Sequence, residues 1–142
     1  MEEVLHYLEL KNNYYEKFYT ITLKFIEQAN QNRWDEIELF VDNRERILNI
    51  IHSFDFKISE NFQMLQLSAE ELDIYRARVK SLMEARAEWA QRIVTLDLEL
   101  ISKMDEMKTE TIRELKRSME TNQQLNSFAP HMKRQPKPRK DV

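Results

Sequence analysis

The chain has 142 residues, with 22 basic and 25 acidic side chains and a net charge of −3. This size fits one domain, and the acidic balance argues against a nucleic-acid partner, which would need a basic face. Cysteine is absent, so disulfides, thiolate nucleophiles and zinc–sulfur sites are excluded. No stretch approaches the roughly 20 apolar residues that cross a bilayer, and no secretory signal is apparent. We therefore expect a cytoplasmic protein without membrane insertion.

Glycine is absent, and the prolines are confined to Pro130, Pro136 and Pro138. Because these two residue types mark most turns and strand ends, a long stretch without them favours helices. We predict an all-α fold: an elongated antiparallel bundle of three long helices over residues 1–126, with a short fourth helix as an alternative. Residues 127–142 are predicted to form a flexible tail rich in proline, lysine and arginine.

The first helix is predicted from about Glu2 to Ala29, where apolar residues recur at a spacing of three and four. The polar cluster at residues 30–32 marks a break, and its asparagines are candidates to cap the next helix. That helix is predicted from Arg33 or Trp34 to about His52. Residues 53–56 interrupt the pattern, and a brief helix is predicted to begin at Ser59.

Ser68 and Glu71 form a capping-box pattern at the start of the longest predicted helix, which reaches about Gln124. Its apolar stripe keeps heptad spacing, which is typical of a helix packed along a seam. At about 1.5 Å per residue this helix would be roughly 80 Å long, about twice the length of the preceding hairpin. Its last part must therefore overhang, dimerise or fold back as a separate helix near Ser102 and Lys103.

This mismatch in length predicts an apolar surface that the chain itself cannot cover. The predicted partner-binding groove consists of Leu82, Trp89, Ile93, Leu96 and Leu100. The predicted regulatory or dimer contact, which covers that groove or competes with a guest for it, consists of Met104, Met107, Ile112, Leu115 and Met119.

The sequence lacks the patterns of the common enzyme sites. The three histidines are far apart, and no phosphate-binding loop can form without glycine. We expect no catalytic residues, no metal and no cofactor. Arg44 and Arg86 lie on otherwise apolar stripes, so a small helical enzyme that binds anions, such as a chorismate mutase, is a formal alternative. The simpler interpretation is that their stems pack along the seam and their guanidinium groups reach the rim or a carboxylate.

Residues 32–48 resemble the second helix of FliT-type flagellar export chaperones. That family has a short polar turn, Trp-Asp-Glu, apolar residues at helical spacing and an Arg-Glu pair. The matching residues are Trp34, Asp35, Glu36, Ile37, Val41, Arg44 and Glu45. The order of a long aromatic-rich helix, this helix and a serine-capped long helix also matches, over about residues 1–125. This chain differs from the family in its longer third helix and its basic tail.

The resemblance implies a cytoplasmic chaperone of flagellar type III export. Such a protein binds an aggregation-prone terminal segment of the filament-cap protein and delivers it to the export ATPase and export gate. In the family, the last helix is regulatory and covers the cargo-binding surface. Two alternatives stay open: a hook-junction-type export chaperone, which shares the helix order and carries a different flagellar export substrate, and a homodimeric coiled-coil module.

Overall fold

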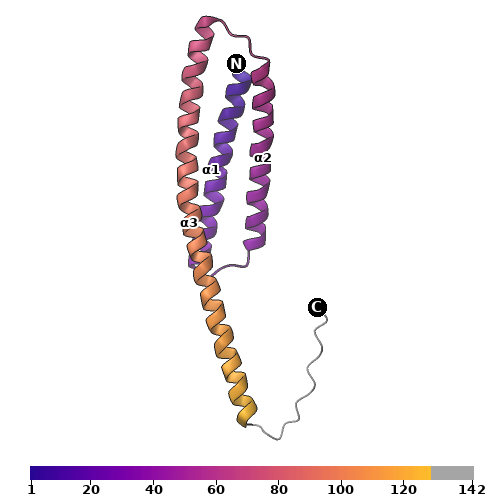
Figure 1. Ribbon diagram of the computed structural model, residues 1–142, viewed down its shortest axis with the longest axis vertical. Coiled ribbons are helices and arrows are strands. Elements are labelled where there is room, and N and C mark those ends of the chain that lie inside the picture. The colour runs from indigo at the N-terminus through magenta and orange to yellow at the C-terminus, as the bar shows by residue number, and fades with distance from the viewer. Residues whose placement is uncertain (129–142) are drawn as a thin grey trace. The chain divides into compact units, whose positions relative to one another are not determined.

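The computed structural model is all-α and has three helices: α1 (Glu2–Asn30), α2 (Ile37–Gln63) and α3 (Ala69–Phe128) (Figure 1). It describes the backbone of residues 1–128 and the side chains of residues 1–121. There is no strand in the described backbone, so the predicted fold class is confirmed. Residues 127 and 128, predicted to belong to the tail, end α3, and the rest of the predicted tail lies outside the described residues.

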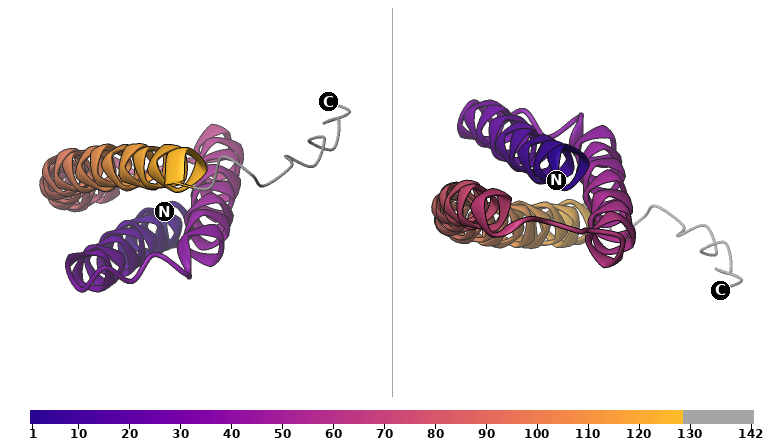
Figure 2. Two further views of the ribbon diagram at one scale, coloured as in Figure 1. Left: turned by 90° about the horizontal axis from the view of Figure 1, so that it is seen from below. Right: turned by 90° about the horizontal axis from the view of Figure 1, so that it is seen from above.

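Residues Met1–Lys103 form one compact unit, and a second unit begins at Met104. In the first unit α1, α2 and the beginning of α3 lie side by side, each antiparallel to the next along the chain (Figure 1). Views along the helix axes place these three segments at the corners of a triangle (Figure 2). In the described part of the chain, only α1 and α2 bring their Cα atoms within 8 Å of each other.

Two apolar clusters hold this unit together, one toward each end of the bundle. One cluster joins all three helices through Phe25, Ile26, Phe40, Leu96 and Leu100. The other is formed by Val4, Leu5 and Tyr75, with half-buried neighbours from each helix around them. Both clusters consist of residues from the apolar stripes, because helical spacing of three and four places such residues on one face.

The chain reverses its direction after α1 in a turn that contains no glycine. Asn32 has a positive φ of 58°, the left-handed conformation that asparagine tolerates better than most residues. The Arg33 N–H donates to the Gln28 carbonyl and the Asn32 N–H to the Ala29 carbonyl, both at 3.0 Å. These two bonds form a Schellman motif, in which Asn32 occupies the usual glycine position.

The predicted start of the second helix was wrong by a few residues. α2 begins at Ile37, so Trp34, Asp35 and Glu36 precede it, and no asparagine side chain caps it. The Phe40 N–H donates to the Glu36 carbonyl at 3.0 Å, which closes the first turn. Residues 34–36 therefore form the end of the connection, and the carbonyls of Trp34 and Glu36 accept hydrogen bonds from the first turn of α2.

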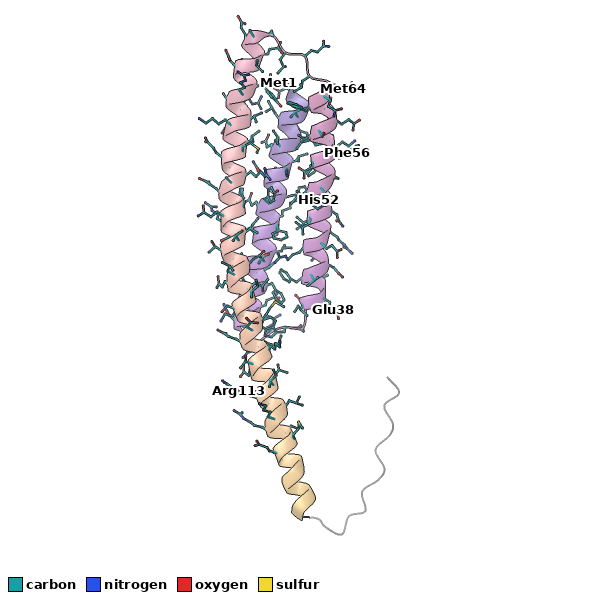
Figure 3. All side chains as sticks on the ribbon, viewed as in Figure 1. Met1, Glu38, His52, Phe56, Met64 and Arg113 are labelled. Atoms are coloured by element: carbon teal, nitrogen blue, oxygen red, sulfur yellow. The ribbon has the colours of Figure 1, made fainter. Side chains whose placement is uncertain are left out.

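The predicted break at residues 53–56 was also wrong, as was the separate helix at Ser59, because α2 continues to Gln63. The ring centroid of Phe54 lies 5.9 Å from that of Tyr7 and 5.4 Å from that of Tyr14, both on α1. A tertiary contact thus stabilises helix where the local pattern indicates a break. Figure 3 follows α2 from Glu38 through His52 and Phe56 to Met64, which directly follows its last residue.

The capping box at the start of α3 is confirmed. The Glu71 N–H donates to Ser68 Oγ at 3.2 Å, and the Ser68 N–H donates to Glu71 Oε1 at 3.3 Å. From there α3 runs through 60 residues without interruption, so no separate fourth helix begins near Ser102.

We predict that replacing Asn32 by alanine lowers the free energy of unfolding by about 1 kcal/mol, because a Cβ without a polar side chain is costly in the left-handed region. Asn32→Gly should stay close to the wild type, since glycine adopts this conformation freely. Urea denaturation measures both. Asn30→Ala, in the last turn of α1, is the matched control and should not destabilise. Equal stability of Asn32→Ala and Asn32→Gly would contradict the assigned turn.

We predict that Tyr75 makes the protein less stable at alkaline pH. Burial raises the pKa of the Tyr75 hydroxyl above its ordinary value of 10.0, because desolvation disfavours the phenolate. This contribution to stability is complete below the pKa of the unfolded chain and is lost as pH rises through the higher folded pKa. Unfolding of Tyr75→Phe should therefore depend less on pH between about pH 9 and pH 11. Tyr19→Phe controls for the loss of a phenol hydroxyl, and an unchanged slope in Tyr75→Phe would contradict the assignment.

Candidate interaction surface

Arg44 of α2 links α2 to α3 through a two-pronged ion pair. Its two terminal nitrogens donate to the two carboxylate oxygens of Asp97 at 3.0 and 3.1 Å. The guanidinium carbon also lies 4.2 Å from the ring centroid of Phe18 and 5.4 Å from that of Phe40. Planar arginine suits both contacts, since it pairs with a carboxylate in its plane and stacks on aromatic faces. The expected pairing of Arg44 with a carboxylate is thus identified as the pair with Asp97.

Exposed apolar residues flank this ion pair on both helices, and we name this surface the α2–α3 seam. Its members are Val41 and Leu48 on α2 and Val94, Leu98 and Ile101 on α3, all of them exposed. Val41 and Leu48 lie about one turn before and after Arg44, and Val94 and Ile101 lie about one turn before and after Asp97. The two apolar edges therefore lie on helices that the Arg44–Asp97 pair joins.

The antiparallel course of α2 and α3 determines which seam residues face each other. Val41 lies on the same side of the ion pair as Ile101, and Leu48 lies on the same side as Val94. Each apolar pair is therefore separated from the other by the Arg44–Asp97 bridge. The seam thus has two pairs of apolar residues, here called steps, about two turns apart. Apolar residues on one face of a helix recur at this spacing.

The α2 edge of the seam is bordered by acidic side chains. Glu38, Asp42 and Glu45 are exposed. The first two of these line a shallow hollow of about 280 Å³ together with Ile37 and Val41. A guest with basic residues along one flank would complement this border.

The five residues of the predicted partner-binding groove lie toward the interior of the bundle. Leu96 and Leu100 are only 5% and 6% exposed and pack in the cluster with Phe25. Leu82 packs against the Val4–Leu5 cluster, whereas Trp89 and Ile93 are half-buried. A guest can reach the buried members only if α3 separates from the hairpin.

Trp89 itself lies between helices α1 and α3. Its ring centroid is 5.7 Å from that of Tyr19, and the Arg92 guanidinium lies 5.0 Å from the same ring. Both contacts are made by the bundle itself. They hold the indole in place without a guest.

The exposed edge formed by Val94, Leu98 and Ile101 was missed by the sequence reasoning. A signal for it exists in the sequence, because these positions lie beside the heptad stripe, where a helix with a single covered face carries polar residues. Apolar residues there indicate a second face on α3. Its neighbour on α2 could not be inferred, since the pairing of Arg44 with Asp97 links residues far apart in the chain.

The predicted regulatory or dimer contact belongs to the second unit. Met107 is half-buried, and the other members are exposed: Met104, Ile112, Leu115 and Met119. Among residues 104–121, Met107 is the one residue that is not exposed. This segment therefore has an apolar face that its own unit leaves open to solvent.

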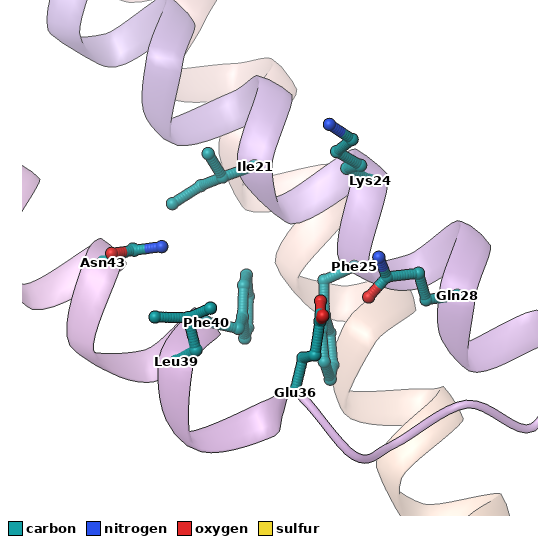
Figure 4. A pocket seen from close by; sticks show the side chains of 8 residues that line it. All are labelled: Ile21, Lys24, Phe25, Gln28, Glu36, Leu39, Phe40 and Asn43. Carbon is teal, nitrogen blue, oxygen red and sulfur yellow. The ribbon is translucent and has the colours of Figure 1, made fainter.

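The motif residues Trp34, Asp35 and Glu36 have different roles. The Trp34 ring meets the Phe25 ring edge-on, with centroids 5.7 Å apart, and Phe25 stacks on Phe40 at 4.2 Å. Asp35 and Glu36 are exposed. Glu36 and the two phenylalanines line a hollow of about 210 Å³ between α1 and α2 (Figure 4). The tryptophan thus closes one end of the core, and the two acids remain at the surface.

Arg44 and Arg86, the two arginines on otherwise apolar stripes, have different surroundings. The guanidinium of Arg44 is already paired, and Arg86 is half-buried without being part of a polar cluster. No group of three or more potential ligand residues that could hold a metal ion occurs among the residues with described side chains. No described helix is both long and apolar enough to span a membrane. Comparison of the chain with protein-family models, curated proteins and solved structures found no match.

We predict a coupling energy of about 1 kcal/mol between Arg44 and Asp97, as expected for a partly exposed bidentate pair. A double-mutant cycle with Arg44→Ala and Asp97→Ala, measured by urea denaturation, gives this value directly. Arg44→Lys should lose most of the coupling because an ammonium group cannot make both bonds. Arg46→Ala, at an exposed position on the same helix, is the control. Additive effects of the two alanine substitutions would contradict the pair.

Proposed function

We propose that the protein is a non-enzymatic chaperone of flagellar type III export that binds an amphipathic segment of the filament-cap protein. The observation that carries the proposal is the α2–α3 seam, where apolar residues stay exposed on two helices of a bundle packed around two cores. Exposed apolar residues gathered on two neighbouring helices are typical of a binding surface.

The seam favours a helix as its guest. One additional helix would lie between α2 and α3 and turn the three-helix unit into a four-helix arrangement. Its apolar residues, spaced three, four and seven apart, would reach the steps formed by Val41 with Ile101 and by Leu48 with Val94. Basic residues on one flank would face Glu38 and Asp42. Binding would need no covalent chemistry.

The choice of cargo rests on the resemblance of residues 32–48 to FliT-type chaperones. From the same resemblance, the export ATPase and the export gate are the proposed further partners. The interior residues Leu96 and Leu100 pack in the cluster with Phe25 and are not part of the seam. Deeper entry of the guest would require α3 to move away from α1, and the competing role of residues 104–119 stays a prediction.

A hook-junction-type chaperone is the alternative within the same class, because the seam accommodates any amphipathic helix of suitable flank charge. The two assignments differ in cargo, so purified filament-cap and hook-junction proteins compared side by side distinguish them. Tighter binding of a hook-junction protein would move the assignment to that class.

We predict that Ile101→Asp weakens binding of the filament-cap protein at least tenfold, a loss of about 1.4 kcal/mol, because a carboxylate would be buried against the guest. Isothermal titration calorimetry measures the affinity. Ile74→Asp is a closely matched control: Ile74 also lies on α3 and is, like Ile101, 55% exposed, but it lies outside the seam.

Ile74→Asp should bind like the wild type. Circular dichroism and urea denaturation of both variants show whether the fold is kept, which is expected because both positions are exposed. Equal affinity of the two variants would place the guest elsewhere, and the lack of any binding to the wild type would overturn the proposed function.

A further inference from the structure

We propose that residues 104–119 of α3, here named the pairing segment, associate antiparallel with the same residues of a second copy of this chain. The interaction goes beyond the proposed export function and uses a different surface from the seam. Its basis is a face of α3 whose apolar residues and charges are both arranged symmetrically about the middle of the segment.

The apolar residues of the pairing segment share one face of the helix. Met104, Met107, Ile112, Leu115 and Met119 follow each other at three, five, three and four residues, which keeps them within less than half of the helix circumference. All but Met107 are exposed. A helix with so little packing of its own is marginal in water, so covering this face would stabilise it.

The positions of these residues are nearly symmetric along the chain. The midpoint of the segment lies between Thr111 and Ile112. Met104 and Met119 are equally far from it, and Met107 and Leu115 are equally far to within one residue. In an antiparallel pair, Met104 therefore lies opposite Met119 of the other copy, and the two Ile112 side chains meet near the two-fold axis.

Charge favours the antiparallel orientation over the parallel one. Residues 104–111 have three acids and one base, and residues 112–119 have three bases and one acid. Antiparallel pairing places the acidic half of each copy beside the basic half of the other, whereas parallel pairing places like charges together.

One pair of charged residues illustrates this complementarity. Asp105 and Lys116 are eleven residues, about three turns, apart and therefore share one flank of the helix. An antiparallel two-fold axis brings equivalent flanks together, so Asp105 of one copy faces Lys116 of the other. The charged flank therefore adds to the apolar contact and specifies its direction.

Cysteine cross-linking of the full chain tests the orientation, because the natural sequence contains no cysteine. We predict that an equimolar mixture of Met104→Cys and Met119→Cys forms a disulfide-linked dimer when an oxidant is added. Met104→Cys alone should not, since its two cysteines would lie about 22 Å apart across an antiparallel pair, too far for a disulfide. Non-reducing electrophoresis over time measures both.

The mass in solution over a dilution series tests the association itself. The wild type should rise from its chain mass of 17.3 kDa toward twice that value as concentration increases. Ile112→Asp should stay monomeric, and Thr109→Asp, at a position that is also exposed but lies away from the apolar face, should associate like the wild type. Circular dichroism confirms that both variants keep their helices.

A wild-type mass of one chain at every concentration would overturn the proposal, as would cross-linking of Met104→Cys alone at the rate of the mixture. Association that Ile112→Asp leaves intact would also overturn it, because the contact would then lie elsewhere. None of these results tests binding at the seam, which the Ile101→Asp and Ile74→Asp comparison tests separately.

Discussion

Side chains alone hold the first part of α3 against the α1–α2 hairpin, since no Cα atom of α3 comes within 8 Å of either helix in the described chain. Two kinds of contact span that distance: apolar packing in the clusters around Phe25 and around Tyr75, and polar side-chain contacts such as the Arg44–Asp97 pair. Arginine is long enough to bridge the wider gap and lies on Phe18 as it does so. The open seam follows from this spacing, because the bridge joins the two helices at one level and leaves apolar residues exposed above and below it.

The sequence establishes the parts of the fold that depend on local chemistry. Helical spacing and the lack of glycine identify the helices, and Ser68 with Glu71 determines where α3 begins. The errors arise where distant residues decide the outcome. Residues 53–56 have a poor local pattern, yet Phe54 packs between Tyr7 and Tyr14 and α2 continues. The start of α2 is shifted because the backbone of residues 30–33 is used by the Schellman turn.

The candidate surface also has a part that the sequence predicts and a part that it does not. The exposure of Leu115 and its neighbours follows from a length argument that needs only the sequence, because two short helices cannot cover one long one. The seam could not be predicted, since its existence depends on which carboxylate pairs with Arg44. Asp97 is one of 25 acidic residues in the chain, and nothing near it in sequence distinguishes it. Without that pair, the exposed edges of α2 and α3 have no known relation to each other.

The two surfaces differ in the partner that their geometry admits. The seam lies along two helices with an acidic border on one side, which is why its proposed guest is a single helix with a basic flank. The pairing segment has an acidic half and a basic half. A second copy that runs in the opposite direction therefore complements its charges. The charges of the pairing segment attract a second copy of the segment, which favours association between chains. The acidic borders of two seams would repel each other, which favours a different partner for the seam. The proposed binding and the proposed association therefore use different residues of the chain.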